Sequence, residues 1–216
     1  MLAHELRNPM STIRSGLTIL GLTITDEMIR PTVEMMNRQT GHLVRMVDDL
    51  LDVSRISRGK IELKTERVNL VEVVRQAAES VRSLYQQQGK GLQIDLPTAP
   101  IELEGDATRL SQVVANLLTN GARYTNEQGQ VWLSLTHKDK EAILQVRDNG
   151  IGLPGDQLSA IFELFVQVDN SLARSKGGLG LGLTLVKRLV EMHGGGWKPR
   201  ARGSAREAPS GFTYRR

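Results

Sequence analysis

The sequence predicts two domains: an all-α helical hairpin over residues 1–59, followed by an α+β sandwich over residues 60–216. Three observations lead to this fold class. Apolar residues in the first part follow a coiled-coil-like rhythm of three and four. The segment SRGK at residues 57–60 ends that rhythm. Beyond it, segments with strand alternation are interspersed with helical ones and include an antiparallel pair, which is typical of an α+β sandwich.

The hairpin consists of predicted helices over residues 2–24 and 32–57. In the first, Pro9 is expected to kink the helix or restrict its start. One hairpin cannot bury both of its faces, so two copies are expected to pair as a four-helix dimer. The alternative is that the hairpin packs on its own C-terminal domain. Five of the seven seam positions in the second helix are apolar; the seam comprises Val33, Met36, Thr40, Leu43, Val47, Leu50 and Ser54.

The second domain alternates short strands with helices. The predicted strands are IELK (61–64), LQIDL (92–96), VWLSLTH (131–137) and AILQVRD (142–148), the last two joined by the polar turn 138–140. The predicted helices span residues 69–88, capped by Asn69, then 107–124, a short segment 157–165, and 181–193.

Composition and charge exclude several functions. The chain has no cysteine, which excludes disulfides, thiolate zinc sites and cysteine nucleophiles. The net charge is +4, but residues 194–216 alone carry six basic residues and one acidic residue. The remainder has 22 basic and 23 acidic residues, so the body of the protein is not basic and nucleic acid is not an expected partner.

Membrane contact is not expected in this segment either. No apolar run approaches the ~20 residues needed to cross a bilayer, and the N-terminus lacks the basic and apolar regions of a signal peptide. We expect a cytoplasmic location for this segment, which leaves open whether a parent protein is anchored in a membrane.

The first motif with chemical potential is NLLTNGARYT at residues 116–125. Helical spacing places Asn116, Asn120 and Arg123 on one side of the predicted helix, followed by Tyr124. An asparagine side-chain oxygen can bind Mg²⁺, and an arginine can bind phosphate. The alternative is an ordinary polar helix face.

The second motif is DNGIGLP at residues 148–154, where a strand ends at Asp148 and two glycines, Gly150 and Gly152, follow. A buried carboxylate at this position can accept hydrogen bonds from an exocyclic amine such as that of adenine. The alternative is a turn that contains two glycines.

The third motif is GGLGLGLTLVKRLV at residues 177–190. Gly178, Gly180 and Gly182 alternate with leucines, and a helix follows at once. Free backbone amides at a helix N-terminus bind anions, and glycines let a phosphate approach closely. The motif is neither a P-loop nor a dinucleotide fingerprint.

The fourth motif is IFELFVQ at residues 161–167, with Phe162 and Phe165. Core packing of a short helix is favoured for these rings over contact with a ligand. Residues 168–177, which include Arg174 and Lys176, have no apolar pattern and are interpreted as a mobile lid over a nucleotide.

Taken in order, HELRNP, NLLTNGARYT, DNGIGL, FELF and GLGLGL resemble the H, N, G1, F and G2 boxes of bacterial sensor histidine kinases. The resemblance covers about residues 1–195. It implies a dimerisation and phosphoacceptor hairpin, followed by an ATP-binding domain of the type shared with gyrase, mismatch-repair and heat-shock-chaperone ATPases.

The resemblance also implies roles for individual residues in binding ATP and Mg²⁺. Asn120 resembles the Mg²⁺ ligand, supported by Asn116, and Asp148 resembles the adenine-reading carboxylate. The remaining implied nucleotide contacts are Arg123, Tyr124, Gly150, Gly152, Lys176, Gly178, Leu179, Gly180, Leu181, Gly182 and Thr184.

In the H box, His4 resembles the phosphoacceptor, whose neutral ring would attack the γ-phosphorus of ATP. The resemblance makes Glu5 the acceptor for the proton on the other ring nitrogen; helix geometry alone would not choose it, because adjacent residues point about 100° apart. Asn8 lies four residues after His4 on the same face. In this family a polar residue there orients water for dephosphorylating the partner, so a phosphatase role for Asn8 is expected.

The implied function is autophosphorylation of His4, followed by transfer to an aspartate on the receiver domain of a response regulator. The alternative is a dimeric ATP-binding scaffold, or a truncated core, without phosphotransfer. An ATPase unrelated to histidine phosphorylation is disfavoured by the H box upstream of a heptad hairpin.

The sequence departs from the family at both ends. Only three residues precede His4, so we expect a catalytic-core fragment or an open reading frame begun at an internal methionine, with a frayed first turn and weakened dimerisation. At the other end, GWKPRARGSAREAPSG at residues 196–211 lacks strand alternation, and only FTYR at residues 212–215 resembles a closing strand. A frameshift or a divergent loop would explain this segment, and disorder is expected over residues 197–211.

Overall fold

A computed structural model describes residues 2–24, 26–57, 62–139, 141–152, 160–162, 166, 180–199 and 208–215. At residues 2–8, 42, 57, 198–199 and 208–215 it describes the backbone only. The chain divides into two compact units, Met1–Ile61 and Glu62–Arg216, close to the boundary predicted at residue 60.

The first unit is the predicted helical hairpin. Helix α1 spans Leu2–Thr23 and helix α2 spans Arg30–Ser57. Helix α1 continues through Pro9, so the proline does not set the start of the helix. At the turn between the helices, the backbone N–H of Met28 donates to Oδ1 of Asp26 at 2.8 Å, a short-range bond that is typical of aspartate in turns.

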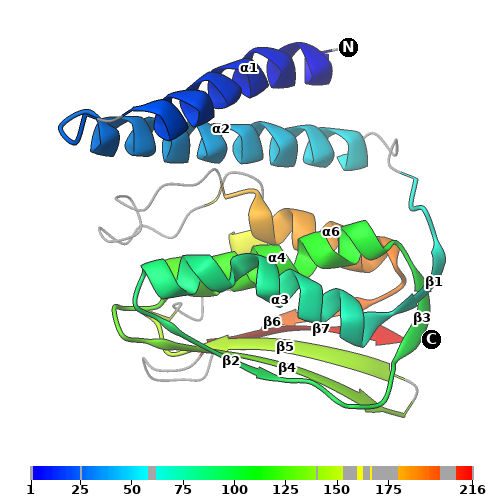
Figure 1. Ribbon diagram of the computed structural model, residues 1–216. Coiled ribbons are helices and arrows are strands. Elements are labelled where there is room, and N and C mark those ends of the chain that lie inside the picture. The colour runs from blue at the N-terminus through cyan, green and yellow to red at the C-terminus, as the bar shows by residue number, and fades with distance from the viewer. Residues whose placement is uncertain are drawn as a thin grey trace. The chain divides into compact units, whose positions relative to one another are not determined.

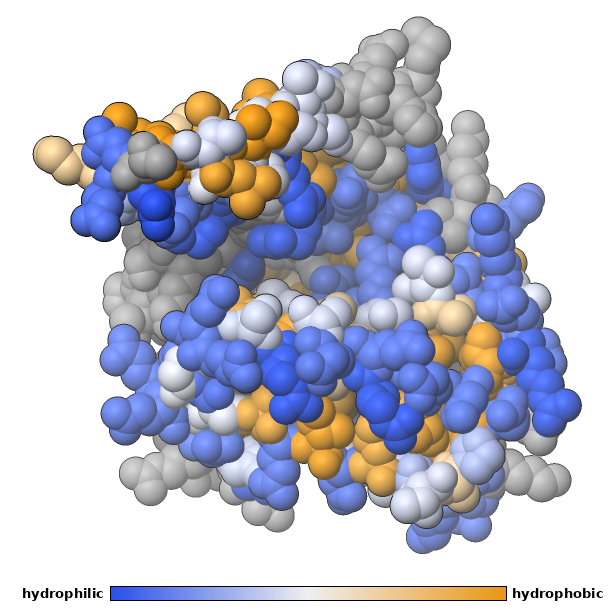
Figure 2. All heavy atoms as spheres, viewed as in Figure 1, coloured by the Kyte–Doolittle hydropathy of each residue, from blue (hydrophilic) through white to orange (hydrophobic). Residues whose placement is uncertain are grey.

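The hairpin buries only part of its apolar surface. Leu17, Val33 and Val53 are buried, and a Cβ built on Gly21 would lie 3.9 Å from Cγ1 of Val33, so the two helices approach closely there. By contrast, the seam residues Met36, Leu43 and Leu50 remain 38–48% exposed. Figure 2 shows hydrophobic side chains at the surface of the hairpin. The hairpin by itself therefore leaves an apolar face uncovered.

The second unit is a two-layer α/β sandwich, as predicted (Figure 1). Among the described residues, helices lie over one face of a mixed sheet whose five strands are hydrogen-bonded in the order given below. The helices are α3 (Leu70–Gln87), α4 (Ala107–Tyr124) and α6 (Gly182–Met192). The strands, in spatial order, are β2 (Gly91–Asp95), β4 (Gln130–Lys138), β5 (Glu141–Asp148), β7 (Ala208–Arg215) and β6 (Gly196–Pro199). Strands β2 and β4 pair in parallel, whereas the other pairs are antiparallel.

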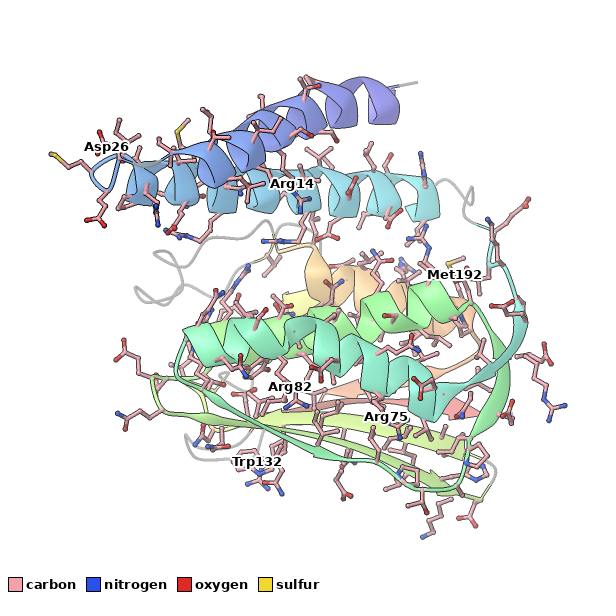
Figure 3. All side chains as sticks on the ribbon, in the orientation of Figure 1. Arg14, Asp26, Arg75, Arg82, Trp132 and Met192 are labelled. Carbon is pink, nitrogen blue, oxygen red and sulfur yellow. The ribbon has the colours of Figure 1, made fainter. Side chains whose placement is uncertain are left out.

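Strand alternation decides which residues form the core between sheet and helices. On β4, Leu133 and Leu135 are buried, as is their neighbour Leu144 on β5. Trp132 points to the opposite face of the sheet, away from the helices (Figure 3), where the guanidinium of Arg147 lies 5.1 Å from its ring centroid. The period of two predicted for these strands is thus confirmed.

A separate two-stranded sheet corrects one predicted strand and adds one that the sequence analysis missed. Strand β1 spans Glu66–Asn69 and pairs antiparallel with β3, Glu102–Gly105. The predicted strand 61–64 is wrong for the described part, residues 62–64, because the backbone N–H of Lys64 donates to the Asp106 carboxylate and not to a neighbouring strand. Strand β3 ends at Gly105, immediately before the helix cap Asp106, where the sequence analysis assigned only the helix.

The expectation of disorder over residues 197–211 is corrected at its two ends, whereas residues 200–207 lie outside the described residues. Strand β6 covers Gly196–Pro199 and β7 covers Ala208–Arg215, so both ends of the segment 197–211 join the sheet. Residues such as Lys198 and Pro209 lack an apolar pattern, yet backbone pairing with β5 holds β7 between two strands. Sheet pairing is a property of the whole backbone, so it tolerates this unusual composition.

Of the predicted short helix over 157–165, the described part is Ala160–Phe162, which forms one 3₁₀ turn. The interpretation of residues 168–177 as a lid lies outside the described residues. Across the described ranges, no helix combines the length and the apolar character that crossing a membrane requires.

Candidate functional site

Helix α4 carries the first cluster of predicted site residues. The carboxylate of Asp106 caps the helix by accepting from the backbone N–H of Arg109 at 3.0 Å. Farther along, Asn116, Asn120 and Arg123 are all partly buried, whereas Tyr124 in the last turn is 37% exposed. The helical spacing predicted from the sequence is therefore present, with the polar groups neither in the core nor fully in solvent.

Two polar atoms in this motif are buried without a hydrogen-bond partner among the described residues. They are Nδ2 of Asn116 and Oγ1 of Thr125. Thr125 is fully buried. An unpaired buried polar group costs about 1–3 kcal/mol. Buried polar atoms without a protein partner are therefore typical of sites where a ligand or an ordered water supplies the missing hydrogen bond.

The loop after β5 lies directly against the end of α4. The backbone N–H of Ile151 donates to the carbonyl of Tyr124 at 3.2 Å. A Cβ added at Gly150 would overlap that same carbonyl oxygen and lie 2.7 Å from Oδ1 of Asp148. Glycine is therefore required at position 150 by close approach, and Gly152 by its φ of 71°. The two motifs predicted from separate stretches of sequence meet here.

Asp148 is the central charged group of this loop. Its Oδ1 accepts a hydrogen bond from the backbone N–H of Gly150 at 2.8 Å. Burial raises the pKa of Asp148 above its ordinary value, although the Gly150 bond acts in the opposite direction. The carboxylate is thus kept in a partly desolvated position where it can accept a hydrogen bond from a ligand.

Tyr85, on α3, supports the site from below. It is fully buried and its hydroxyl donates to the carbonyl of Leu118 in α4 at 2.7 Å. Burial, and next the charge of Asp148, raise the pKa of Tyr85 well above its usual range. The phenol therefore stays neutral and remains a hydrogen-bond donor to α4 near the Asp148 carboxylate.

The start of α6 forms the third part of the site. Gly180 has a φ of 70°, and the buried Leu181 precedes the helix without a side-chain cap bond. A Cβ built on Gly182 would lie 3.8 Å from Nδ2 of Asn120, so the first turn of α6 lies beside the polar face of α4. Uncapped N–H groups at the start of a helix, next to an amide side chain, form an anion-binding arrangement.

Thr184 and Phe162 tie this helix to the 3₁₀ turn. The Thr184 hydroxyl donates to the carbonyl of Phe162 at 2.9 Å, so its proton is used within the protein. The Phe162 ring packs edge-on against Trp197 with 5.5 Å between centroids, and Nζ of Lys187 lies 5.9 Å above it. Packing is therefore the role that these contacts give Phe162, as the sequence favoured.

Some predicted site residues are not described. Lys176, Gly178 and Leu179 lie outside the described residues, as does Phe165. His4, Glu5 and Asn8 belong to α1, but their side chains are not described.

Sequence reasoning missed three residues that support the site. They are Tyr85, Lys90 and His193. Nζ of Lys90 donates to the carbonyl of Ala122 near the end of α4, and His193 is buried at the end of α6. For Lys90 the signal was weak: a cation following a glycine can reach the C-terminal carbonyls of another helix only if the fold brings it there. Nothing local distinguishes Tyr85 or His193 from ordinary core residues.

Comparison with known proteins identifies the family. A model of the histidine kinase-, DNA gyrase B- and HSP90-like ATPases matches residues 105–214, which is more than half of the chain. A model of the His Kinase A phospho-acceptor domain matches residues 1–59. The chain belongs to the sensor histidine kinase family. The two matches place the phosphoacceptor domain of the kinase core on the hairpin and the ATPase domain on the α/β sandwich.

Curated relatives of this kinase core are considerably longer. The chain is 34% identical over 202 residues to the circadian input-output histidine kinase CikA of Synechococcus elongatus. The match covers 90% of this chain and 26% of CikA. It is 33% identical over 194 residues to the signal transduction histidine-protein kinase BaeS of Escherichia coli. This match covers 90% of the present chain and 41% of BaeS. The kinase core thus spans less than half of either relative.

Among solved structures, the kinase core resembles full-length ShkA in complex with AMPPNP. The TM-score is 0.79 at 28% sequence identity, and the match covers 99% of this chain and 44% of the ShkA chain. The resemblance therefore extends over both the hairpin and the sandwich.

Proposed function

We propose that this kinase core binds ATP, phosphorylates itself on His4 and passes the phosphoryl group to an aspartate on a response-regulator receiver domain. The observation that carries the proposal is the convergence of three distant segments. The Asp148–Gly152 loop is bonded to the end of α4, and the start of α6 lies beside Asn120 on the same helix. The AMPPNP bound by the similar ShkA supports ATP as the ligand.

Asp148 would read the adenine. Its carboxylate is partly desolvated and already accepts the Gly150 N–H, which fixes its orientation. A carboxylate held in this way accepts a hydrogen bond from an exocyclic amine and rejects a base that presents a carbonyl there. Glycine at position 150 lets the loop pack against the Tyr124 carbonyl beside this carboxylate, where a Cβ would overlap.

The phosphates would lie between α4 and the start of α6. The uncapped N–H groups that follow Leu181 would donate to phosphate oxygens, and Arg123 would add positive charge. Asn120 would hold Mg²⁺ through its side-chain oxygen, with Asn116 supporting it, because Mg²⁺ takes few protein ligands. Mg²⁺, when bound, neutralises charge that develops on the phosphate oxygens. The unpartnered Nδ2 of Asn116 fits a site that a ligand or water completes.

His4 would act as the nucleophile. The lone pair of one ring nitrogen attacks the γ-phosphorus in line, a P–N bond forms, and the bond to the β–γ bridging oxygen breaks as ADP leaves. The proton on the other ring nitrogen is held by Glu5 and stabilises the developing positive charge. Attack of a receiver aspartate on the same phosphorus would then break the P–N bond.

Asn8 would contribute a phosphatase activity toward the phosphorylated receiver domain. It lies four residues after His4 in the continuous helix α1, so both positions share one helix face. Its amide would orient a water for attack on the acyl phosphate. Unchanged dephosphorylation of the partner by an Asn8→Ala variant would remove this part of the proposal.

The proposed kinase core acts as a homodimer through the hairpin. The support is the apolar seam on α2, where Met36, Leu43 and Leu50 stay half-exposed in the single chain. Pairing two hairpins would bury this seam as in a four-helix bundle.

The deciding experiment is incubation of the chain with γ-labelled ATP and Mg²⁺, beside the His4→Ala variant. We expect a protein-bound label that is lost in acid, survives alkali and is absent from the variant, because phosphohistidine has this stability. Nucleotide binding is measured in parallel for both proteins. Nucleotide binding without any label would instead favour the ATP-binding scaffold.

A further inference from the structure

Asp106 makes one more hydrogen bond than a helix cap requires. Its residue is 7% exposed. Oδ1 accepts from the backbone N–H of Arg109 at 3.0 Å, which is the ordinary capping bond. Oδ2 accepts from the backbone N–H of Lys64 at 3.0 Å, although Lys64 lies 42 residues earlier in the chain. The carboxylate therefore joins the segment before β1 to the start of α4.

The backbone of Asp106 is held in turn by His193. The Asp106 N–H donates to Nε2 of His193 at 3.0 Å, and Nδ1 of the same ring lies 2.7 Å from the carbonyl of Leu189. Because Nε2 accepts, the ring proton is on Nδ1 and donates to Leu189. His193 is buried at the C-terminal end of α6. Asp106 is thus fixed by α4 and by α6.

These two helices also carry the nucleotide site. Asn120 lies fourteen residues beyond Asp106 on α4, a distance of about 21 Å along a straight helix. Gly182 begins α6, eleven residues before His193, or about 16 Å. The backbone of Lys64 is therefore attached to the same rigid frame that holds the proposed phosphate and Mg²⁺ ligands, at the opposite ends of its helices.

Lys64 is the point where this attachment meets the connection to the hairpin. Helix α2 ends at Ser57, and β1 begins at Glu66. Seven residues from Ser57 to Lys64 span at most about 25 Å when fully extended. Without the bond to Asp106, the connection would run to Glu66 and reach about 32 Å. A longer unanchored connection lowers the effective concentration of one tethered unit near the other.

We propose that Asp106 is a positioning residue for autophosphorylation: by holding the Lys64 backbone, it fixes where the chain enters the nucleotide-binding unit and so improves delivery of the γ-phosphate to His4. The inference rests on the proposed function. It assigns Asp106 no contact with nucleotide. Loss of the bond therefore slows phosphorylation and leaves nucleotide affinity unchanged.

The test compares two substitutions at position 64 in the full chain. Lys64→Pro removes the N–H donor, whereas the matched control Lys64→Ala removes the side chain and keeps the donor. We expect Lys64→Pro to lower the maximal rate of labelling on His4 by ~10-fold, since small misplacements of reacting groups cost this much or more. Its KM for ATP and its nucleotide Kd stay within about twofold of the Lys64→Ala values, because no nucleotide contact is lost.

A second variant gives an independent test. Asp106→Asn keeps an oxygen for the Arg109 N–H and so preserves the cap, but places an amide donor against the Lys64 N–H. We expect the same fall in rate with the same nucleotide Kd. If Lys64→Pro does not fold, Asp106→Asn decides the question by itself.

Three outcomes would overturn the inference. Equal labelling rates for Lys64→Pro and Lys64→Ala would show that the bond has no effect on phosphotransfer. A rise in nucleotide Kd that accounts for the lower rate would reduce Asp106 to a structural role in the site. A wild-type chain that binds nucleotide without labelling His4 would overturn the proposed function and, with it, this inference; labelled wild type with unaffected variants removes the inference alone.

Discussion

At the scale of single residues, Asp148 shows how a site residue is retained at a cost to folding. Burial raises its pKa from the ordinary value of 3.8, so the ionised form is less favourable in the folded chain than in the unfolded one. The protonated form of Asp148 therefore favours folding. Its contribution to the free energy of unfolding is fully present below pH 3.8 and is lost as the pH rises through the raised pKa of the folded chain.

Asp148→Asn should therefore stabilise the nucleotide-free protein at pH 7 while impairing its function. The amide keeps an oxygen for the Gly150 N–H but carries no charge. We expect a higher melting temperature than wild type at pH 7, a difference that shrinks toward pH 4, and nucleotide binding weakened by ~10-fold or more, as for loss of a charged hydrogen bond. Thermal melts across this pH range and nucleotide titrations measure both effects.

The control for that variant is Asp95→Asn, on the exposed part of β2. It should leave nucleotide affinity unchanged and show no such pH-dependent gain. Equal melting temperatures for Asp148→Asn and wild type at neutral pH would contradict the assignment of a desolvated carboxylate to this loop.

At the scale of elements, α3 illustrates how far local signals determine a helix. Asn69 was predicted as its cap, and Oδ1 of Asn69 accepts from the Val71 N–H at 3.1 Å. Leu70, Val74 and Ala78 are fully buried against the sheet, as the helical period of the apolar residues requires. The sequence therefore predicted the start of this helix through its cap, and the buried face agrees with the helical period.

Asn69→Ala should lower the free energy of unfolding by about 1 kcal/mol, the usual cost of losing a side-chain cap. In a domain of this size the loss corresponds to a melting temperature lower by about 2–4 °C. The matched variant Asn69→Ser keeps a capping oxygen and should retain most of the stability. Denaturant unfolding of both variants measures the difference, and an Asn69→Ala protein as stable as wild type would show that the cap contributes nothing.

Elements that depend on distant partners were predicted less well. Strand β3 was missed, and the strand expected at residues 61–64 was misplaced, because its N–H at Lys64 bonds to the Asp106 carboxylate. Strand β7 contains Pro209 and Gly211, which are depleted in strands, yet it pairs with both β5 and β6. In each case the partner that decides the conformation lies many residues away.

At the scale of the whole molecule, the exposed seam of the hairpin predicts the oligomeric state. Leu43 lies in the middle of the seam and is 48% exposed in the single chain. Leu43→Glu would bury a charge in the proposed dimer interface, which is strongly unfavourable without a partner. We expect the dimer dissociation constant to rise by at least ~10-fold, measured by sedimentation at several protein concentrations.

Met28→Glu is the matched control because Met28 is 88% exposed and lies in the turn between the helices, away from the seam. It should leave the oligomeric state unchanged. A Leu43→Glu protein that still forms dimers as tightly as wild type would place the dimer contact on another surface.

The sequence by itself determined which reactive and ligand-binding residues the chain carries and most of the local secondary structure. Five motifs in order identified the family, helical spacing placed Asn116 and Asn120 on one side of α4, and alternation predicted strands β4 and β5. These features follow from short-range periodicity and from side chains whose chemistry is visible without neighbours.

Only the tertiary structure decided how these parts meet. In the folded chain the Asp148 loop is hydrogen-bonded to the end of α4, and Gly182 lies beside Asn120. Tyr85, Lys90 and His193 make further hydrogen bonds that support the site. It also joined Lys64 to Asp106 across 42 residues. Contacts of this kind depend on the path of the whole backbone, and no local pattern in a single sequence specifies which distant donor will reach a given acceptor.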